Sequence, residues 1–145
     1  MTIEVTGLHH FVIRVQDPDR SRAFYERTFG FTFIELPVED TGLLAAWRGH
    51  PEEGSLLATP LGTTFFVLGP PLEGTTADDR FDERRIGVDH LAFGVADPGT
   101  LDEVVAALGR AGVPTAGVEH DAVLDKDYVA FRDPDNVQWE FYVST

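Results

Sequence analysis

The 145-residue chain contains no cysteine and a single methionine. Without cysteine there is no disulfide, no thiolate metal ligand and no cysteine nucleophile, so any metal must be bound by histidine and carboxylate side chains. Basic residues are also scarce, with 11 Lys and Arg against 25 Asp and Glu and a formal charge of -14. Because such a chain repels polyanions, we expect neither nucleic acid nor a membrane as a partner.

Long apolar runs are missing as well. The longest, LLAAW and FFVL, are far too short to span a bilayer. The first twenty residues carry scattered charges and no apolar core of a signal peptide. Together with the lack of cysteine, this favours a cytoplasmic protein. A hydrophobic content of 43% and an aromatic content of 11% indicate one compact, ordered domain.

The chain contains an internal repeat. The segment GLHHFVIRVQDP begins at Gly7, and GVDHLAFGVADP begins at Gly87. Five of the twelve positions are identical, namely Gly7/Gly87, His10/His90, Val15/Val95, Asp17/Asp97 and Pro18/Pro98. A helix-like stretch follows each copy, so the same strand, Asp-Pro and helix pattern occurs twice.

The local signals predict an α+β fold of two βαβββ modules. Each Asp-Pro pair is a good helix opening, and the helices are expected to end at Gly30 and Gly112. Further strands are predicted at 31–36, 43–48, 63–68, 115–120, 127–132 and 137–143. We therefore predict one domain over residues 1–145, with module 1 at about 5–70, a connector at about 70–85 and module 2 at about 86–145. The charge run from Asp78 to Arg85 is interpreted as a solvated loop.

Strand alternation predicts which side chains share a face. His10 and His90 alternate with bulky apolar residues that should lie under the helices, so both histidines are expected on the opposite, concave face. On the last strand Glu140 alternates with Trp139 and Phe141. If the strands are neighbours, two imidazoles and one carboxylate converge and form a divalent metal site with open coordination positions. The alternative to a ligand role for each histidine is a structural role, as a hydrogen-bonded side chain at the start of a strand.

Three segments together resemble a known family. They are HHFVIRVQDPDRSRAFYERTFGF, DHLAFGVADP and FRDPDNVQWEFY, and they resemble the vicinal oxygen chelate superfamily. That superfamily includes glyoxalase I, extradiol ring-cleaving dioxygenases, methylmalonyl-CoA epimerase, and fosfomycin and bleomycin resistance proteins. The resemblance covers nearly the whole chain. It implies a cupped, incompletely closed mixed β-barrel of paired modules, with helices outside, around a metal, in a protein that forms homodimers.

The resemblance places the metal ligands at His10, His90 and Glu140. The position of a further ligand, which many glyoxalase and epimerase members take from the fourth strand, falls on Phe66. A set of three ligands is closer to the dioxygenase pattern, which favours Fe2+ or Mn2+ as the cofactor. Zn2+, Ni2+ or Co2+ would instead accompany glyoxalase-type lyase or isomerase chemistry.

Two further residues are candidates for contact with substrate. The tyrosine that such dioxygenases place ten residues before the glutamate corresponds here to Ala130, and Tyr128 lies two residues earlier with the same parity. Arg14 shares the face of His10 and is a partner either for an anionic substrate or for a buried carboxylate. Tyr128 and Arg14 are therefore the predicted catalytic residues.

The other histidines have weaker claims. His9 alternates away from the metal face, which favours a hydrogen-bonding neighbour or a solvent-facing residue. His50 and His120 lie beside expected loops and strand ends, where surface exposure competes with an acid-base role. There is no GxSxG, Walker A or GxGxxG motif, so triad hydrolysis, P-loop chemistry and dinucleotide binding have no support.

Three functional hypotheses follow. The first is a mononuclear divalent-metal enzyme that acts on a small substrate with vicinal oxygens, either extradiol-like or of the glyoxalase type. The second is a protein of the bleomycin-resistance type that sequesters an antibiotic or metabolite. The third is a structural or regulatory partner module.

Overall fold

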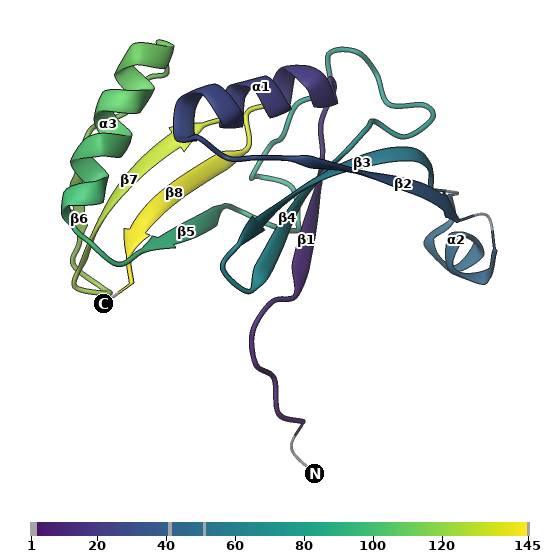
Figure 1. Cartoon of the computed structure of the whole chain (residues 1–145), viewed down its shortest axis with the longest axis horizontal. Coiled ribbons are helices and arrows are strands. Elements are labelled where there is room, and N and C mark those ends of the chain that lie inside the picture. Colours follow the sequence, from purple (N-terminus) through teal and green to yellow (C-terminus); the bar gives the residue numbers. More distant parts are fainter. Residues whose placement is uncertain (1–2, 41, 51, 145) are drawn as a thin grey trace. The chain divides into compact units, whose positions relative to one another are not determined.

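The computed structural model describes residues 3–40, 42–50 and 52–144 (Figure 1). Its elements, in chain order, are β1 (His10–Arg14), α1 (Pro18–Phe29), β2 (Ile34–Asp40), α2 (Leu43–Arg48), β3 (Glu52–Leu61), β4 (Thr64–Gly69), β5 (Leu91–Val95), α3 (Gly99–Ala111), β6 (Glu119–Asp121), β7 (Lys126–Arg132) and β8 (Gln138–Val143). The chain divides into two compact units. Unit 1 comprises Met1–Glu26 and Phe31–Ala77, and unit 2 comprises Arg27–Gly30 and Asp78–Thr145.

Each unit contains one four-stranded mixed sheet. The strand order is β1-β4-β3-β2 in unit 1 and β5-β8-β7-β6 in unit 2. In each sheet the first strand of the repeat pairs in parallel with the last, and the other neighbours are antiparallel. The predicted α+β class with two βαβββ modules is therefore confirmed.

The prediction of a strand at 43–48 is wrong, because this segment forms helix α2. Leucine, alanine and arginine are strong helix formers, and the helix ends at Gly49, whose φ of 82° is readily adopted only by glycine. The strand that the topology requires is instead β3, which begins after the helix and was not predicted. Its sequence contains Gly54 and Pro60, both of which weaken a strand signal.

Other predicted boundaries are closer to the structure. The segments predicted at 63–68, 127–132 and 137–143 are β4, β7 and β8, each within one residue at either end. The strand predicted at 31–36 starts later, at Ile34, and the one at 115–120 is reduced to the short β6. The helix ends are confirmed, and Gly112 closes α3 with a φ of 69°.

The core of unit 1 lies between α1 and one face of its sheet. Tyr25 of α1 is fully buried, and its ring meets Phe66 of β4 edge to face at 5.0 Å. Phe66 in turn stacks on Phe11, its cross-strand partner in β1, at 5.2 Å. The helix-facing side of β1 is thus the one that alternation predicted. Asp17 accepts a hydrogen bond from the amide of Arg20, as expected for the residue that opens the helix.

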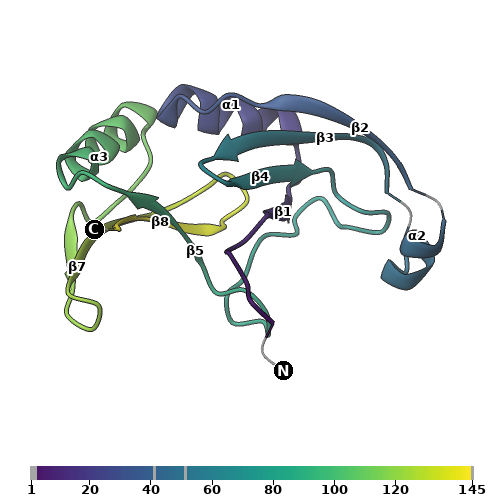
Figure 2. The ribbon, with the colours of Figure 1, turned by 60° about the horizontal axis from the view of Figure 1, so that its bottom comes forward.

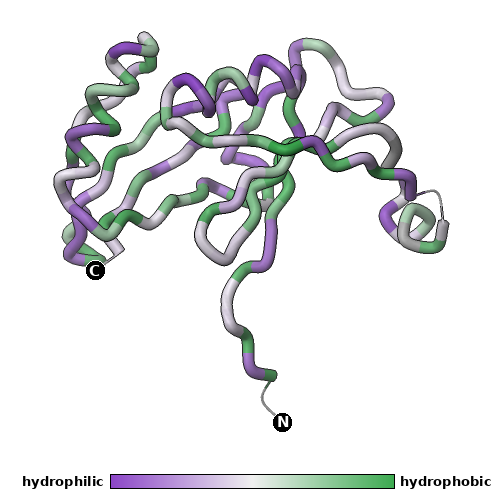
Figure 3. The backbone as a smooth tube through the Cα atoms, viewed as in Figure 1, coloured by the Kyte–Doolittle hydropathy of each residue, from purple (hydrophilic) through white to green (hydrophobic). Residues whose placement is uncertain are grey.

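The core of unit 2 lies on the face of its sheet that α3 covers (Figure 2). Leu101, Val104 and Leu108 are the large buried residues of this amphipathic helix, whose alternation of apolar and polar residues is visible in Figure 3. Within the sheet Phe93 stacks on Trp139 at 4.6 Å, and Trp139 is fully buried. These aromatic side chains supply much of the apolar area that stabilises the unit.

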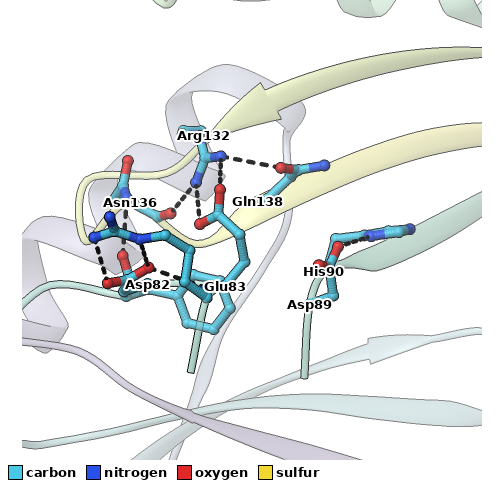
Figure 4. Close-up of polar contacts among 9 residues, drawn as sticks. Asp82, Glu83, Asp89, His90, Arg132, Asn136 and Gln138 are labelled. Atoms are coloured by element: carbon cyan, nitrogen blue, oxygen red, sulfur yellow. Dashed lines mark hydrogen bonds and ion pairs between the residues drawn. The ribbon is translucent and has the colours of Figure 1, made fainter. Parts of the chain in front are cut away.

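The charge run at 78–85 is only partly the solvated loop that the sequence predicts. Glu83 forms a bidentate ion pair with Arg132 (Figure 4). The backbone amide of Phe81 donates to the carbonyl of Asp135, and the side-chain amide of Asn136 donates to the carbonyl of Phe81. Residues 81–83 are half-buried, whereas 78–80 and 84–85 are exposed. The sequence interpretation is therefore wrong for the middle of the run, because Arg132 supplies a partner that is distant along the chain.

None of the helices in the described part of the chain has the length and apolar character needed to cross a bilayer.

The register of β4 can be tested with two adjacent phenylalanines. Phe66 is fully buried, whereas Phe65 points to the opposite face and is 39% exposed. We expect Phe66→Ala to lower the free energy of unfolding by about 3–5 kcal/mol, because it removes a buried aromatic ring and leaves a cavity. Phe65→Ala should cost only about 1 kcal/mol. Urea unfolding followed by circular dichroism measures both, and equal or reversed losses would show that the register is shifted by one residue.

Candidate metal centre

Glu140 lies in the middle of β8 with short side chains beside it. Its cross-strand partners are Ala92 of β5 and Ala130 of β7. The residue is only 7% exposed, which is unusual for a glutamate. Strand alternation turns it away from Trp139 and Phe141, as the sequence predicts. A carboxylate in such a place needs a proton, a hydrogen-bond donor or a cation to compensate for lost solvation.

His90 directly precedes β5 and meets Glu140. Its Nε2 lies 3.5 Å from Oε2 of Glu140, and its Nδ1 lies 2.6 Å from Oδ1 of Asp89. Figure 4 shows the contact between Asp89 and His90 at the start of the strand. Among the described side chains, Nε2 of His90 is the one polar group that contacts the carboxylate of Glu140. The predicted pairing of these two residues is therefore present within unit 2.

The donor set of this pair fits a cation. Because a carboxylate only accepts, the contact with Asp89 puts a proton on Nδ1 of His90. In the neutral ring Nε2 then directs a lone pair toward the carboxylate of Glu140. Two facing acceptors are joined either by a proton on Nε2 or by a metal ion, for which imidazole nitrogen and carboxylate oxygen are both common ligands.

His10, the third predicted ligand, belongs to unit 1. It opens β1, is exposed, and its Nδ1 lies 2.9 Å from Nδ1 of His9. His9 is thus a hydrogen-bonding neighbour, which is one of the two roles expected for it. Among the described residues, no group of three or more His, Asp or Glu side chains is gathered into a metal-binding cluster. His90 and Glu140 are by themselves an incomplete ligand set.

The structure corrects the residue assigned to the fourth-strand ligand. Ala92 is opposite Glu140 in unit 2, and its repeat counterpart Val12 is opposite Val67 in unit 1. The counterpart of Glu140 is therefore Val67 and not Phe66, which points into the core. The sequence alignment of β4 with β8 is one residue out of register, because both strands are rich in apolar residues. Neither Phe66 nor Val67 has a side-chain atom that can bind a metal, so the fourth-strand ligand is missing in both alignments.

Tyr128 lies on the same sheet face as Glu140, with an aromatic partner. Its ring stacks on Tyr142, its cross-strand neighbour, at 5.1 Å. Burial, followed by the charge of Glu119, raises the pKa of Tyr128 above its ordinary value. The Tyr142 hydroxyl donates to Oδ2 of Asp121 at 2.5 Å, and this bond raises the pKa of Tyr142 and lowers that of Asp121. Both phenols therefore stay protonated at neutral pH.

The remaining candidates have contacts of their own. Arg14 donates to the carbonyl of Pro70 at 3.2 Å, and its side chain packs across Gly69. His120 is exposed and bonds Asp127 at 2.8 Å, which raises the pKa of the imidazole. His50 is half-buried just after α2. A catalytic role for Arg14 stays a prediction.

Two contacts near Glu140 were not predicted. One is the contact of Asp89 with Nδ1 of His90, although the sequence shows this carboxylate directly before the repeated histidine. Tyr142 shares the parity of Glu140, but its partner Asp121 comes from β6, and only the sheet topology brings the two together.

Comparisons with known proteins agree with this architecture. The chain is 30% identical over 136 residues to the uncharacterized protein YwkD of Bacillus subtilis (strain 168), covering 94% of this chain and 95% of that protein. A glyoxylase/bleomycin resistance protein/dioxygenase domain from Frankia sp. EAN1pec superposes with a TM-score of 0.75 at 27% identity, over 98% of this chain and 100% of that one. Lactoylglutathione lyase from Agrobacterium tumefaciens shares the fold, with a TM-score of 0.65 at 19% identity and coverage of 97% and 96%.

The family assignment follows from the sequence match itself. Residues 7–141 match the family described as Glyoxalase/Bleomycin resistance protein/Dioxygenase superfamily. This range contains both repeats, both sheets except the last two residues of β8, and His10, His90 and Glu140. The chain belongs to the Glyoxalase/Bleomycin resistance protein/Dioxygenase superfamily.

Proposed function

We propose that the protein is a mononuclear divalent-metal enzyme that acts on a small organic substrate through two neighbouring oxygens. Its metal ligands are His10, His90 and Glu140. The observation that carries the proposal is the placement of Nε2 of His90 at 3.5 Å from the buried carboxylate of Glu140. A structural ion pair would not require an alanine on each side of the glutamate, whereas a metal and its substrate need room there.

His10 completes the ligand set by its place in the repeat. It corresponds to His90, lies on the face of its sheet that α1 does not cover, and is exposed. A metal with three protein ligands keeps open positions for substrate and water. The third ligand comes either from the same chain or from a second copy, which would make the protein the homodimer that its family resemblance implies.

A bound divalent metal would supply Lewis-acid chemistry, polarising the substrate oxygens. The chain's own residues then have distinct tasks. Glu140 and His90 would hold the ion, and Ala92 and Ala130 would leave space beside it. Tyr128, protonated at neutral pH, would donate a hydrogen bond to a substrate oxygen on the same face but would not act as a base.

Within the superfamily we place the activity with the extradiol-type dioxygenases, with Fe2+ or Mn2+ as the cofactor. The support is Val67, which stands where a fourth ligand would be expected and offers no ligand atom. Glyoxalase-type lyase or isomerase activity with Zn2+, Ni2+ or Co2+ is the alternative within the same proposal. We also propose that the protein works in the cytoplasm.

Removal of a ligand should abolish tight metal binding. Isothermal titration of metal-free protein with Mn2+ should show one site per chain in the wild type. We expect His90→Ala and Glu140→Gln each to weaken binding by about 100-fold or more, since loss of even an outer-shell contact costs 10–100-fold. His120→Ala is the matched control, because His120 is an exposed histidine of the same unit. Unchanged affinity in both ligand variants would contradict the site.

The type of reaction can be separated by the metal that the protein retains. We expect elemental analysis of anaerobically purified protein to find iron or manganese. Addition of catechols should then cause oxygen uptake in the wild type and not in Glu140→Gln. Bound zinc or nickel, with no oxygen uptake, would instead select the lyase or isomerase branch.

A second candidate function is sequestration of an apolar or aromatic small molecule. The observation that favours it is the sheet face of unit 1 on the side away from α1, which is largely apolar. Its partly exposed members, on neighbouring strands, are Val12, Ile34, Leu36 and Phe65. Unlike the enzyme, a sequestering protein should bind its ligand without metal.

This second function has a direct test. Metal-free protein titrated with polycyclic and glycopeptide antibiotics should bind one of them tightly without altering it. Phe65→Ser should weaken that binding by about 10-fold, since an aromatic contact contributes roughly 1–1.5 kcal/mol. Ser substitution at Phe24, a half-buried phenylalanine of α1, is the control. Equal binding by both variants would exclude this face as the binding surface.

A further inference from the structure

We infer that Asp89 and His9 are positioning residues that hold the two candidate histidine ligands in one tautomer, with Nε2 as the metal-binding atom. The two residues occupy matched places, each directly before its histidine in the internal repeat. The claim about metal rests on the proposed function, whereas the claim about tautomers does not. Neither residue touches the reacting atoms, so each acts only through the histidine that follows it.

For a neutral His90 ring, the unit 2 geometry leaves one arrangement of protons. Oδ1 of Asp89 lies 2.6 Å from Nδ1 of His90, a short distance typical of a charge-assisted hydrogen bond. Since the carboxylate accepts, Nδ1 is the protonated nitrogen of the neutral ring. The lone pair of the neutral imidazole is then on Nε2, the atom that faces Glu140 at 3.5 Å. The hydrogen bond at one nitrogen thereby selects the other nitrogen as ligand.

Unit 1 repeats the arrangement with a different partner. Nδ1 of His9 and Nδ1 of His10 are 2.9 Å apart, so one ring donates and the other accepts. Donation by His10 leaves its Nε2 unprotonated, as in His90. The backbone of this segment is tied to β4, because the amide of Phe65 donates to the carbonyl of His9 at 2.9 Å and Oγ1 of Thr64 donates to the carbonyl of Leu8 at 2.7 Å. The backbone of Leu8 and His9 is thus held against β4, and we assign the donation to His10.

The two partners differ in charge, and this difference sets the expected size of their effects. The anionic carboxylate of Asp89 is a stronger hydrogen-bond acceptor for Nδ1–H of His90 than a neutral imidazole is for Nδ1–H of His10. Loss of the Asp89 carboxylate should therefore weaken metal binding more than loss of the His9 ring. Asp89 and His90 are also well exposed, and exposed ion pairs contribute little to folding stability. Replacement of Asp89 should leave the urea midpoint unchanged, which separates positioning from a structural role.

The tautomer is tested first, in the metal-free protein. Two-bond 15N–1H NMR spectra at pH about 8.5, where imidazole is ordinarily neutral, identify which ring nitrogen carries the proton. We expect the Nδ1–H form for His90 and His10 in the wild type, loss of that preference for His90 in Asp89→Ala, and its recovery in Asp89→Glu. His120, whose Nδ1 bonds Asp127, is the internal control. Asp127→Ala should alter His120 and leave His90 unchanged.

Cobalt binding is tested second. Titration with Co2+, followed by its visible absorption, should show affinity weakened by about 10- to 100-fold in Asp89→Ala and by less in His9→Ala. The absorption spectrum of the bound ion should also change in Asp89→Ala and return in Asp89→Glu.

The outcomes distinguish the two levels of the proposal. An Nε2–H tautomer for His90 in the wild type overturns the inference, even where Co2+ binds and the metal enzyme stands. Unchanged Co2+ affinity in Asp89→Ala overturns it as well. An Nδ1–H tautomer without any Co2+ binding to the wild type overturns the proposed function and, with it, the metal-positioning role of Asp89 and His9.

Discussion

The site in unit 2 depends on the register between β5 and β8. In that register Phe93 and Trp139 stack under α3, while Ala92 is opposite Glu140. A shift of one residue would turn the Glu140 carboxylate toward the apolar core under α3 and turn the fully buried tryptophan to the opposite face, because side chains alternate along a strand. The hydrophobic effect thus sets the position of the acid. The position of the polar groups on one face is a consequence of the packing on the other.

The two units carry different surfaces on the same framework. In both sheets, aromatic and aliphatic residues occupy the face toward the helix. On the opposite side unit 1 presents mainly apolar groups around Val67, whereas unit 2 presents Glu140, Tyr128 and Tyr142 at related or neighbouring positions. The helix side must remain apolar for folding, so the opposite side is where a duplicated module can change without loss of stability. The histidine is present in both copies of the repeat, whereas the glutamate is present only in unit 2.

Predictions from the sequence succeeded where local signals and alternation agree. The Asp-Pro pairs at the helix starts and the glycines at the helix ends identified α1 and α3. Alternation along β8 placed Glu140 and Trp139 on opposite faces of the sheet. They failed at α2, where an apolar run of helix formers was interpreted as a strand, and at β3, whose glycine and proline obscured it. The assignment of Phe66 in place of Val67 failed for another reason. Apolar strands superpose equally well in two registers until hydrogen-bonded neighbours are known.

The sequence by itself determined the composition of the proposed site: no thiolate is available, His10 and His90 occupy matched repeat positions, and Glu140 supplies a carboxylate on the last strand. It also determined the family and the βαβββ order. Only the tertiary structure decided which groups meet. The contact between His90 and Glu140 joins residues far apart in the chain, and Tyr142 reaches Asp121 through a strand order that no local pattern encodes. Local signals act over a few residues, whereas such contacts arise from strand pairing, whose register is selected by burial of the whole apolar face.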